Sequence, residues 1–376
     1  MLNIFTKIII ISSFALSLVN AHVLNYKYKL LKKRDEPFLY YYDQLHDNEK
    51  RIYNAIKDQI EGAIQRGHGL YDFEIYEIPV RHESEASLVG FRATSAFVMD
   101  NPKYFWIGHG NEQKITTLGN VIKEMHIGFK QSYSDDEIIK MYNEINNAVV
   151  PVVDAVNKIP TICEKLKYIH DYLIKLIVYQ YGDDYNKYNI YGALVDHESV
   201  CEGYAEAFTY LCQLTNIPTI IVNSETHEWN FVKMDDDKWY AMDVTYDDPK
   251  IGNMEFKSGN DKNKKYDYFL IGTESPIITD NVKMLYRDSA DHKLLNYLLV
   301  ESSTGFNFPE LADNAYNCPI NKKTNYIQDY YVPNKHIYLY VLIGLGILFI
   351  ISFIVMCIRG SKWEKKRKSS SPSQNS

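Results

Sequence analysis

The stretch ESVCEGYAEAFTYL, residues 198–211, places a cysteine at the start of a predicted helix. Apolar side chains recur there at helical spacing, and Ser199 is a candidate capping residue, which puts Cys201 in the first turn. Unpaired backbone N–H groups and the helix dipole favour negative charge at that point, so they would stabilise a thiolate or an oxyanion. A catalytic nucleophile is one interpretation of this cysteine. A buried structural cysteine, or half of a disulfide, is the other.

A nucleophilic cysteine needs a base, and the base needs a group that orients it. Both occur in THEWNFVKMDDDKWYAMDVTY, residues 226–246, where two strand-like runs flank DDD, a turn signal. A hairpin centred on Asp235 would place His227 directly opposite Asp243, with Cβ atoms about 4.5–5.5 Å apart. A register slip of one residue would turn the two side chains to opposite faces. A lone histidine on a strand is usually structural, but a histidine and an aspartate sharing a face among aromatic residues indicate a catalytic pair.

These segments together resemble the transglutaminase-like superfamily, and most closely its microbial secreted members. The resemblance is carried by GALVDHESVCEGYAEAFTYLCQLTNIPTIIV (192–222), HEWNFVKMDDDKWYAMDVTYDDP (227–249) and YDYFL (266–270). It is strongest over residues 160–275 and looser over residues 45–155. It implies an α+β fold that is papain-like, with a nucleophile helix packed on an antiparallel sheet.

The resemblance also implies roles for single residues. Cys201 would be the nucleophile, His227 the base and Asp243 its orienting group. The reaction would be acyl transfer on protein or peptide amides through a thioester, without a cofactor or a metal ion. The Cys201 backbone N–H would be one oxyanion donor. Papain-like proteases carry a glutamine near the position of Val195, so the Tyr191 hydroxyl becomes a candidate for the second donor, with core packing as its other interpretation.

Other functions with the same fold stay open at this point. A cysteine peptidase or amidase would use the same residues and pass the acyl group to water. A binding module or surface scaffold would keep the fold without turnover, although an intact Cys201–His227–Asp243 set disfavours it. The sequence does not decide between water and an amine as the acceptor.

The two ends of the chain predict a membrane topology. Residues 4–19 form a short apolar run with one lysine, followed by a small-residue cleavage pattern ending at Ala21, which is typical of a signal peptide. Residues 337–358 carry no charge, and the tail behind them has six basic residues and one acidic residue. We therefore expect a single-pass type I membrane protein whose catalytic domain is extracellular or lumenal.

The chain divides into seven expected parts. They are a signal peptide (1–21), a flexible leader (22–44), an N-terminal α/β region (45–158), a transglutaminase-like core (159–280), a stalk (281–336), a transmembrane helix (337–358) and a basic cytoplasmic tail (359–376). Within the two folded parts, hydrophobic periodicity predicts helices at 47–67, 134–160 and 161–179 and a strand at 71–80.

Charge and cysteine content exclude several classes of protein. The net charge of −7 becomes −13 for residues 22–336 once the tail (+5) and Lys7 (+1) are removed, which argues against a nucleic-acid partner. Five cysteines in so long a chain do not form a disulfide scaffold, and C-x-x-C and H-E-x-x-H spacings are absent, so a zinc site has little support. We interpret His170 and Asp171 as structural or solvated, and Asp247 and Asp248 as weak candidates for cation binding.

Overall fold

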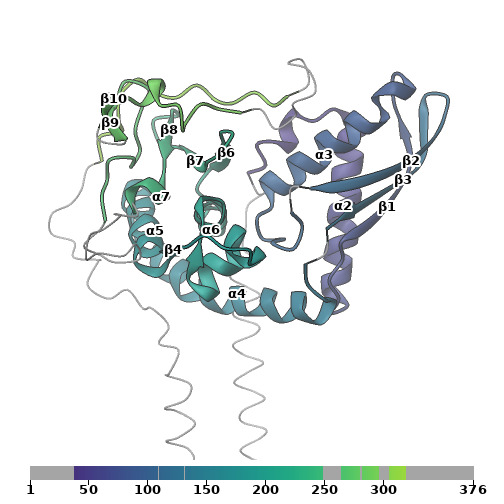
Figure 1. Ribbon diagram of the computed structural model, residues 1–376, viewed down its shortest axis with the longest axis horizontal. Helices are drawn as coiled ribbons and strands as arrows, with labels where there is room; N and C mark the ends of the chain where they lie inside the picture. The colour runs from purple at the N-terminus through teal and green to yellow at the C-terminus, as the bar shows by residue number, and fades with distance from the viewer. Residues whose placement is uncertain are drawn as a thin grey trace, which may run out of the picture. The chain divides into compact units, whose positions relative to one another are not determined.

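The computed structural model describes residues 38–108, 110–130, 132–248, 264–279, 282–295 and 305–318 (Figure 1). These residues fall in the first of the two units into which the chain divides, Met1–Gln328. The expected signal peptide, transmembrane helix and basic tail lie outside the described residues. Within the described ranges, no helix is both long and apolar enough to cross a membrane.

The N-terminal region is a three-stranded antiparallel sheet packed against two helices (Figure 1). Its elements are α2 (Asp47–Gln65), β1 (Asp72–Pro79), α3 (Ala86–Asp100), β2 (Asn111–Leu118) and β3 (Val121–Phe129). The strand order is β1–β3–β2. Helix α2 buries Ile52, Ile56 and Ile60, which recur at helical spacing, and packs on β1. The predicted helix at 47–67 and strand at 71–80 are thus confirmed.

The core places one buried helix against a second antiparallel sheet. Its main elements are α4 (Asp135–Val156), α5 (Ile162–Leu176), α6 (Cys201–Leu214), β6 (Thr219–Asn223), β7 (Glu228–Lys233) and β8 (Trp239–Met242). Helix α6 packs on β6 and β7, and α5 packs on α6. Every residue of β6 is buried, so both faces of that strand are covered. The α+β class is confirmed.

Capping residues define where the core helices begin. Ser134 caps α4 in a capping box, in which its backbone N–H donates to the Glu137 carboxylate at 2.8 Å. The Thr161 hydroxyl accepts from the backbone N–H of Glu164 and caps α5. Helix α6 differs from the prediction, because Val200 is its N-cap residue and Ser199 instead donates its hydroxyl proton to the carbonyl of Lys187.

Several short elements complete the described residues. They are the 3₁₀ helices η1 (Tyr42–Gln44), η2 (Glu83–Glu85), η3 (Tyr185–Tyr188) and η5 (Tyr286–Asp288), the π-helix η4 (Gly192–Asp196), the short helix α7 (Val244–Asp247), and the strands β4 (Val178–Tyr179), β5 (Glu198–Ser199), β9 (Pro276–Thr279) and β10 (Val282–Leu285). The parallel pair β4–β5 brings Tyr179 beside Ser199, close to the start of α6.

The hairpin that joins β7 to β8 has a different centre from the predicted one. Phe231 pairs with Ala241 and Val232 with Tyr240, so the hairpin is centred on Asp236 rather than on Asp235. Asp237 takes a left-handed conformation (φ 62°) in the turn. Each residue of β7 therefore pairs with a residue of β8 that lies two positions later in the sequence than predicted. Because side chains alternate with a period of two, the shift preserves the face on which each residue lies.

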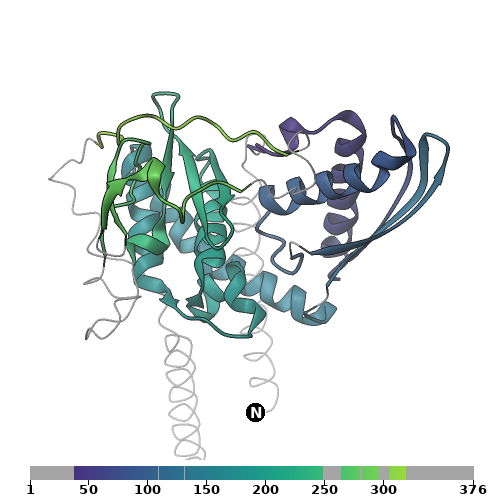
Figure 2. The same cartoon turned by 45° about the horizontal axis from the view of Figure 1, so that its top comes forward.

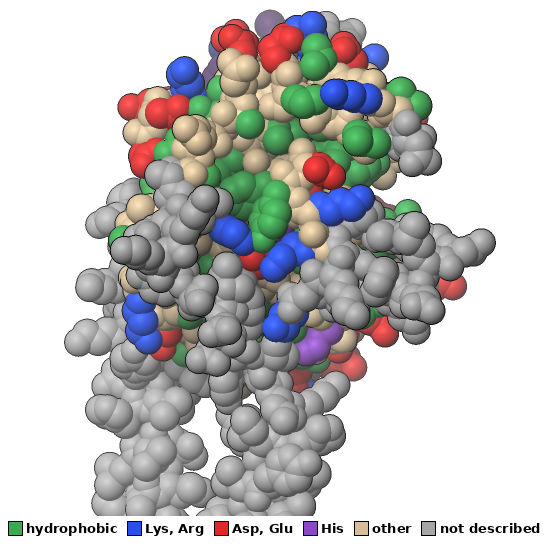
Figure 3. Space-filling view, turned by 90° about the vertical axis from the view of Figure 1, so that its left-hand side faces the viewer, with side chains coloured by type: hydrophobic (Ala, Val, Ile, Leu, Met, Phe, Trp, Pro, Cys, Tyr) green, Lys and Arg blue, Asp and Glu red, His purple; other side chains and the backbone are tan. Residues whose placement is uncertain are grey.

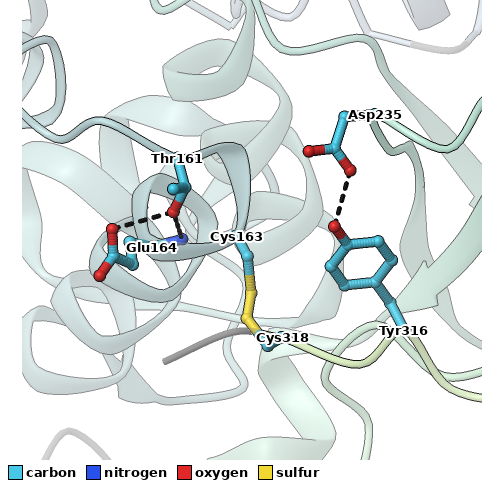
Figure 4. The surroundings of a disulfide bond; sticks show 6 residues. All are labelled: Thr161, Cys163, Glu164, Asp235, Tyr316 and Cys318. Atoms are coloured by element: carbon cyan, nitrogen blue, oxygen red, sulfur yellow. Dashed lines mark hydrogen bonds between the residues drawn. A yellow bond between two sulfur atoms is a disulfide. The ribbon is translucent and has the colours of Figure 1, made fainter. Parts of the chain in front are cut away.

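The C-terminal described segments pack on the core and tie it to the N-terminal region. Figures 1 and 2 show residues 305–318 running beside both, and the Arg92 guanidinium donates to the Gly305 carbonyl at 2.7 Å. Leu311 forms a parallel bridge with Trp239. Figure 4 shows the disulfide between Cys163 and Cys318, at the far end of the segment. We expected residues 281–336 to be a stalk, but their described parts lie against the core instead.

The face that includes the side of α5 and β9–β10 carries side chains of every kind. In Figure 3, acidic, basic and hydrophobic side chains are interspersed on its described part. No surface of a single charge sign is visible among the described residues of this face. The expectation that the chain has no nucleic-acid partner stays a prediction.

Candidate active site

Cys201 is the first residue of α6, where the chain turns from the short strand β5 into the helix. Its side chain is half-buried. Gly203 allows the helix to lie this close to its neighbours, because a Cβ atom there would lie 2.0 Å from the Ser199 Oγ and 2.8 Å from the Asn189 carbonyl oxygen. The backbone N–H groups of the first turn have no partner within the helix, so they are available to a negatively charged group near the sulfur.

His227 and Asp243 come from the two ends of the β7–β8 hairpin. His227 precedes β7, and Asp243 follows β8 as the N-cap residue of α7. The His227 Nε2 lies 2.6 Å from the Asp243 Oδ2. The Asp243 Oδ1 accepts from the backbone N–H of Tyr246 at 3.0 Å. The structure thus brings the predicted pair together, as diagonal rather than directly opposed neighbours on one face of the hairpin.

His227 also lies beside the cysteine. Its Nε2 is engaged by Asp243, which leaves Nδ1 as the nitrogen for the Cys201 thiol, and His227 and Cys201 line the same two cavities. Burial by itself lowers the pKa of His227. The negative charge and hydrogen bond of Asp243, helped by Cys201, outweigh burial and raise this pKa to about 10. Burial likewise opposes ionisation of Asp243, but the charge of His227 holds its pKa below the usual range. The arrangement favours an imidazolium paired with the Asp243 carboxylate.

Aromatic rings shield the imidazole from water. Trp229 stacks on His227, with ring centroids 5.6 Å apart and planes 9° apart. Tyr246 approaches the His227 ring edge-on at 4.9 Å. The His227 side chain is 8% exposed and that of Asp243 is 2% exposed. In such a site the hydrogen bond and the charge pairing are stronger than in water.

Two cavities meet at Cys201 and His227. One has a volume of about 370 Å³ and the other of about 260 Å³. Tyr179, Tyr181 and Thr226 line both of them. The cysteine therefore faces a groove that extends to both sides of it, which suits an extended substrate rather than a small enclosed one.

Carboxylates line this groove, and no lysine or arginine of the described residues does. The acidic lining residues are Asp248 and Asp291 in the larger cavity and Glu202, Glu225 and Glu228 in the smaller one, but burial raises the pKa of Glu228 well above its usual range and so favours its neutral form. Tyr204 donates its hydroxyl proton to Asp248 at 2.9 Å, so part of this charge is engaged within the protein. The acidic lining still favours neutral or positively charged ligands.

Tyr191 does not line either cavity. Its hydroxyl donates to the Glu144 carboxylate on α4 at 2.7 Å, and its ring lies against Phe105. The structure therefore places Tyr191 in the packing between α4 and the π-helix, which fits its core-packing interpretation and not that of an oxyanion donor. The sequence analysis missed Tyr179, which lines the groove at the end of β4. It missed this residue because the predicted helix at 161–179 extended through it.

His292 is the second residue that sequence reasoning missed. It lies in the range expected to be a stalk, and its Nε2 is 2.9 Å from the Asp243 Oδ2. Donor atoms of His227, Asp243 and His292 all lie within 4.8 Å of one another, a spacing that a metal ion could use. In the structure the same atoms are engaged in hydrogen bonds to each other. These hydrogen bonds account for the positions of His227, Asp243 and His292 without a metal ion.

A second buried charged cluster lies beneath α7. The His170 Nδ1 is 3.0 Å from Asp171, and its Nε2 is 3.0 Å from Asp247. All three side chains are buried. Burial opposes charge on His170, but the two carboxylates raise its pKa. These residues join α5 to α7, so the structural interpretation of His170 and Asp171 fits, and Asp247 is engaged internally rather than open to a cation.

Cys212 lies in the same helix as Cys201 but is fully buried. Burial raises the pKa of its thiol to about 12, despite a hydrogen bond to Thr219 that lowers it. The described residues thus contain two free cysteines in different surroundings.

Comparison with known proteins locates this site within a family. Residues 152–244 match the transglutaminase-like superfamily. No curated protein matches the chain. Among solved structures, a TGase is 14% identical over 36% of this chain and 44% of its own length, with a TM-score of 0.24.

Two further solved structures are similar to the same extent. A candidate cysteine protease from Cytophaga hutchinsonii is 13% identical over 36% of this chain and 62% of its own, with a TM-score of 0.24. The periplasmic domain of TgpA from Pseudomonas aeruginosa, bound to ethylmercury, is 12% identical over 35% of this chain and 58% of its own, with a TM-score of 0.23. The chain spans less than two thirds of each of these structures.

Proposed function

Because residues 152–244 belong to the transglutaminase-like superfamily, we propose that the protein is a cysteine-dependent acyltransferase acting on protein or peptide amides. The observation that carries the proposal is that His227 holds Asp243 with its Nε2 and lines the groove together with Cys201, which leaves its Nδ1 for the thiol. This is the arrangement that activates a thiol nucleophile and orients its base.

The reaction begins with attack of the Cys201 thiolate on a carboxamide or peptide carbonyl carbon in the groove. The C–S bond forms, and the carbonyl oxygen takes up negative charge. The Cys201 backbone N–H at the start of α6 is one donor for that oxyanion. Tyr179, which lines both cavities, replaces Tyr191 as the candidate for the second; its hydroxyl donates to the Tyr181 hydroxyl at 3.0 Å and would have to turn toward the oxyanion.

His227 then transfers its proton to the leaving nitrogen. The C–N bond breaks, the amine or ammonia departs, and a thioester remains on Cys201. Asp243 keeps the imidazole oriented throughout and stabilises its charged form. Water or an amine attacks the thioester carbonyl carbon and gives its proton to His227. The C–S bond breaks, which releases the acid or the new amide and returns Cys201 as the thiolate.

The compartment of the reaction is part of the proposal. The Cys163–Cys318 disulfide supports an oxidising environment, since such bonds form mainly outside the cytoplasm. Together with the predicted signal peptide and the uncharged run at 337–358, it supports a membrane-anchored enzyme whose catalytic domain is extracellular or lumenal. Cysteine peptidase or amidase activity is the second candidate, because the same Cys201, His227 and Asp243 set serves when water attacks the thioester.

An amine-incorporation assay tests the function. Purified full-length protein would be incubated with proteins from its host and a biotin-labelled primary amine, while ammonia and new peptide termini are measured in parallel. Wild-type protein and the matched control Cys212→Ala should give labelled protein, ammonia or cleaved peptide, and Cys201→Ala should give none. Labelled protein identifies transamidation, and release without labelling identifies hydrolysis. Wild-type signals no higher than those of Cys201→Ala would refute the enzyme function.

A further inference from the structure

His292 lies outside the family-matched residues 152–244 but contacts the catalytic aspartate. Its side chain is fully buried. The Nε2 atom is 2.9 Å from the Asp243 Oδ2, and the Nδ1 atom is 2.9 Å from the Ser289 Oγ. An ionised carboxylate only accepts hydrogen bonds, so Nε2 carries the proton and donates it to Asp243.

This bond gives Asp243 a second anchor. One carboxylate oxygen accepts from the backbone N–H of Tyr246, and the other accepts from both His227 and His292. Without His292, that second oxygen would be held only by the imidazole whose orientation it must determine. Because His292 donates to this oxygen independently of His227, the carboxylate keeps its position when the His227 ring moves.

Residues next to His292 hold the other groups around the catalytic histidine. The Trp229 Nε1 donates to the Tyr286 hydroxyl at 2.9 Å, and Trp229 is the ring that stacks on His227. Tyr246, the ring at the edge of His227, donates its hydroxyl proton to Asp291 at 2.7 Å. Residues 286–292 therefore support the carboxylate and both shielding rings.

We propose that His292 is a positioning residue, which fixes the Asp243 carboxylate so that His227 presents its other nitrogen to Cys201. The proposal deepens the acyl-transfer function and rests on it. It means that the site is completed by a segment some 50 residues beyond the aspartate, in a part of the chain that the family match does not reach.

Two substitutions separate the hydrogen bond from the packing. His292→Phe keeps a ring against Tyr268, on which His292 stacks at 5.2 Å, but removes the donor. His292→Gln loses the ring but keeps an N–H donor close to the position of Nε2. If the donor matters, His292→Phe should lower kcat about 10-fold to 100-fold, as expected for a hydrogen bond to a charged group. KM should stay within about 3-fold, and His292→Gln should recover most of kcat.

The rate at which iodoacetamide alkylates Cys201 at pH 6 is a second readout that does not require turnover. His292→Phe should slow it, because His227 no longer holds a thiolate beside it, and His292→Gln should restore it. The exposed His82→Phe change is the matched control and should alter neither readout. A purely structural His292 would lower the melting temperature and leave both readouts unchanged.

Unchanged kcat and alkylation in His292→Phe would overturn the proposal, and so would equal losses in the Phe and Gln variants. If His292→Phe does not fold, Ser289→Ala decides, because it releases only the Nδ1 side of His292. A loss of several-fold in both readouts supports the proposal, and no change overturns it. If wild-type protein shows no acyl transfer, the proposed function fails, while the alkylation rates still test the role of His292.

Discussion

Replacing Asp243 with asparagine removes the charge that controls His227. Burial alone would lower the pKa of this histidine from its ordinary value of 6.5, but the Asp243 charge and hydrogen bond, with Cys201, raise it to about 10. At about 1.4 kcal/mol per pH unit, that difference corresponds to about 5 kcal/mol of preference for the imidazolium. In Asp243→Asn burial should dominate, so the imidazolium should lose its proton at or below about pH 6.5.

The sign of the stability effect follows from the raised pKa. A group whose folded pKa exceeds its unfolded value adds stability that is fully present below the unfolded pKa. In the wild-type protein this contribution is complete below about pH 6.5 and is lost as the pH rises through about 10. The free energy of unfolding should therefore fall by up to about 5 kcal/mol over that range, and Asp243→Asn should not show this fall.

The assay combines pH-dependent alkylation of Cys201 with urea unfolding at pH 6.5 and pH 10. The alkaline change in the alkylation rate, which reports loss of the imidazolium proton, should move down by at least about 3.5 pH units in Asp243→Asn. The kcat at pH 8 should fall about 10⁴-fold, as for an aspartate that sets a histidine tautomer. Asp183→Asn, at an exposed site, is the matched control. An alkaline change that stays near pH 10 in Asp243→Asn would refute the reasoning, because Asp243 could then not be the cause of the raised pKa.

Three further predictions concern the cysteines and the topology. Cys201→Ala should abolish acyl transfer and leave the melting temperature within about 2 °C, since a half-buried thiol contributes little packing; a large loss of stability would instead indicate a structural cysteine. Iodoacetamide should modify Cys201 in the folded protein below pH 7 and should reach Cys212 only on unfolding, as read by peptide mass. Equal labelling of the two cysteines would mean that His227 does not activate Cys201. Deleting residues 337–376 should release soluble protein from cells. In the full-length protein, protease added outside intact cells should digest the catalytic domain but spare a C-terminal epitope. A protected catalytic domain would mean an internal membrane or the opposite orientation.

Local patterns were sufficient for the elements that carry the nucleophile and its base. The apolar periodicity that predicted helices at 134–160 and 161–179 placed their starts within one residue of where α4 and α5 begin. The hairpin centre was wrong by one residue, because three consecutive aspartates give no local signal for which of them takes the left-handed conformation. The face shared by His227 and Asp243 was nevertheless predicted, since a partner shift of two residues does not change the face.

Tyr191 and His292 show where local reasoning failed. Tyr191 lies ten residues before the cysteine, but the chain between them passes through a π-helix and the strand β5, so its hydroxyl points to Glu144 instead of the groove. His292 has no regular pattern around it. Its contact with Asp243 spans 49 residues of sequence, and only the packing of the chain on the core creates it.

The sequence by itself determined the chemical identity of the site: a cysteine at a helix start, and a histidine and an aspartate on one face of a hairpin. These follow from spacings of a few residues, where backbone geometry leaves few choices. Tertiary structure decided which side chains surround that set, namely Tyr179 from the β4–β5 pair, Trp229 over the imidazole and His292 behind the carboxylate. Such contacts depend on how distant segments bury their apolar surface together, and no local period encodes that choice.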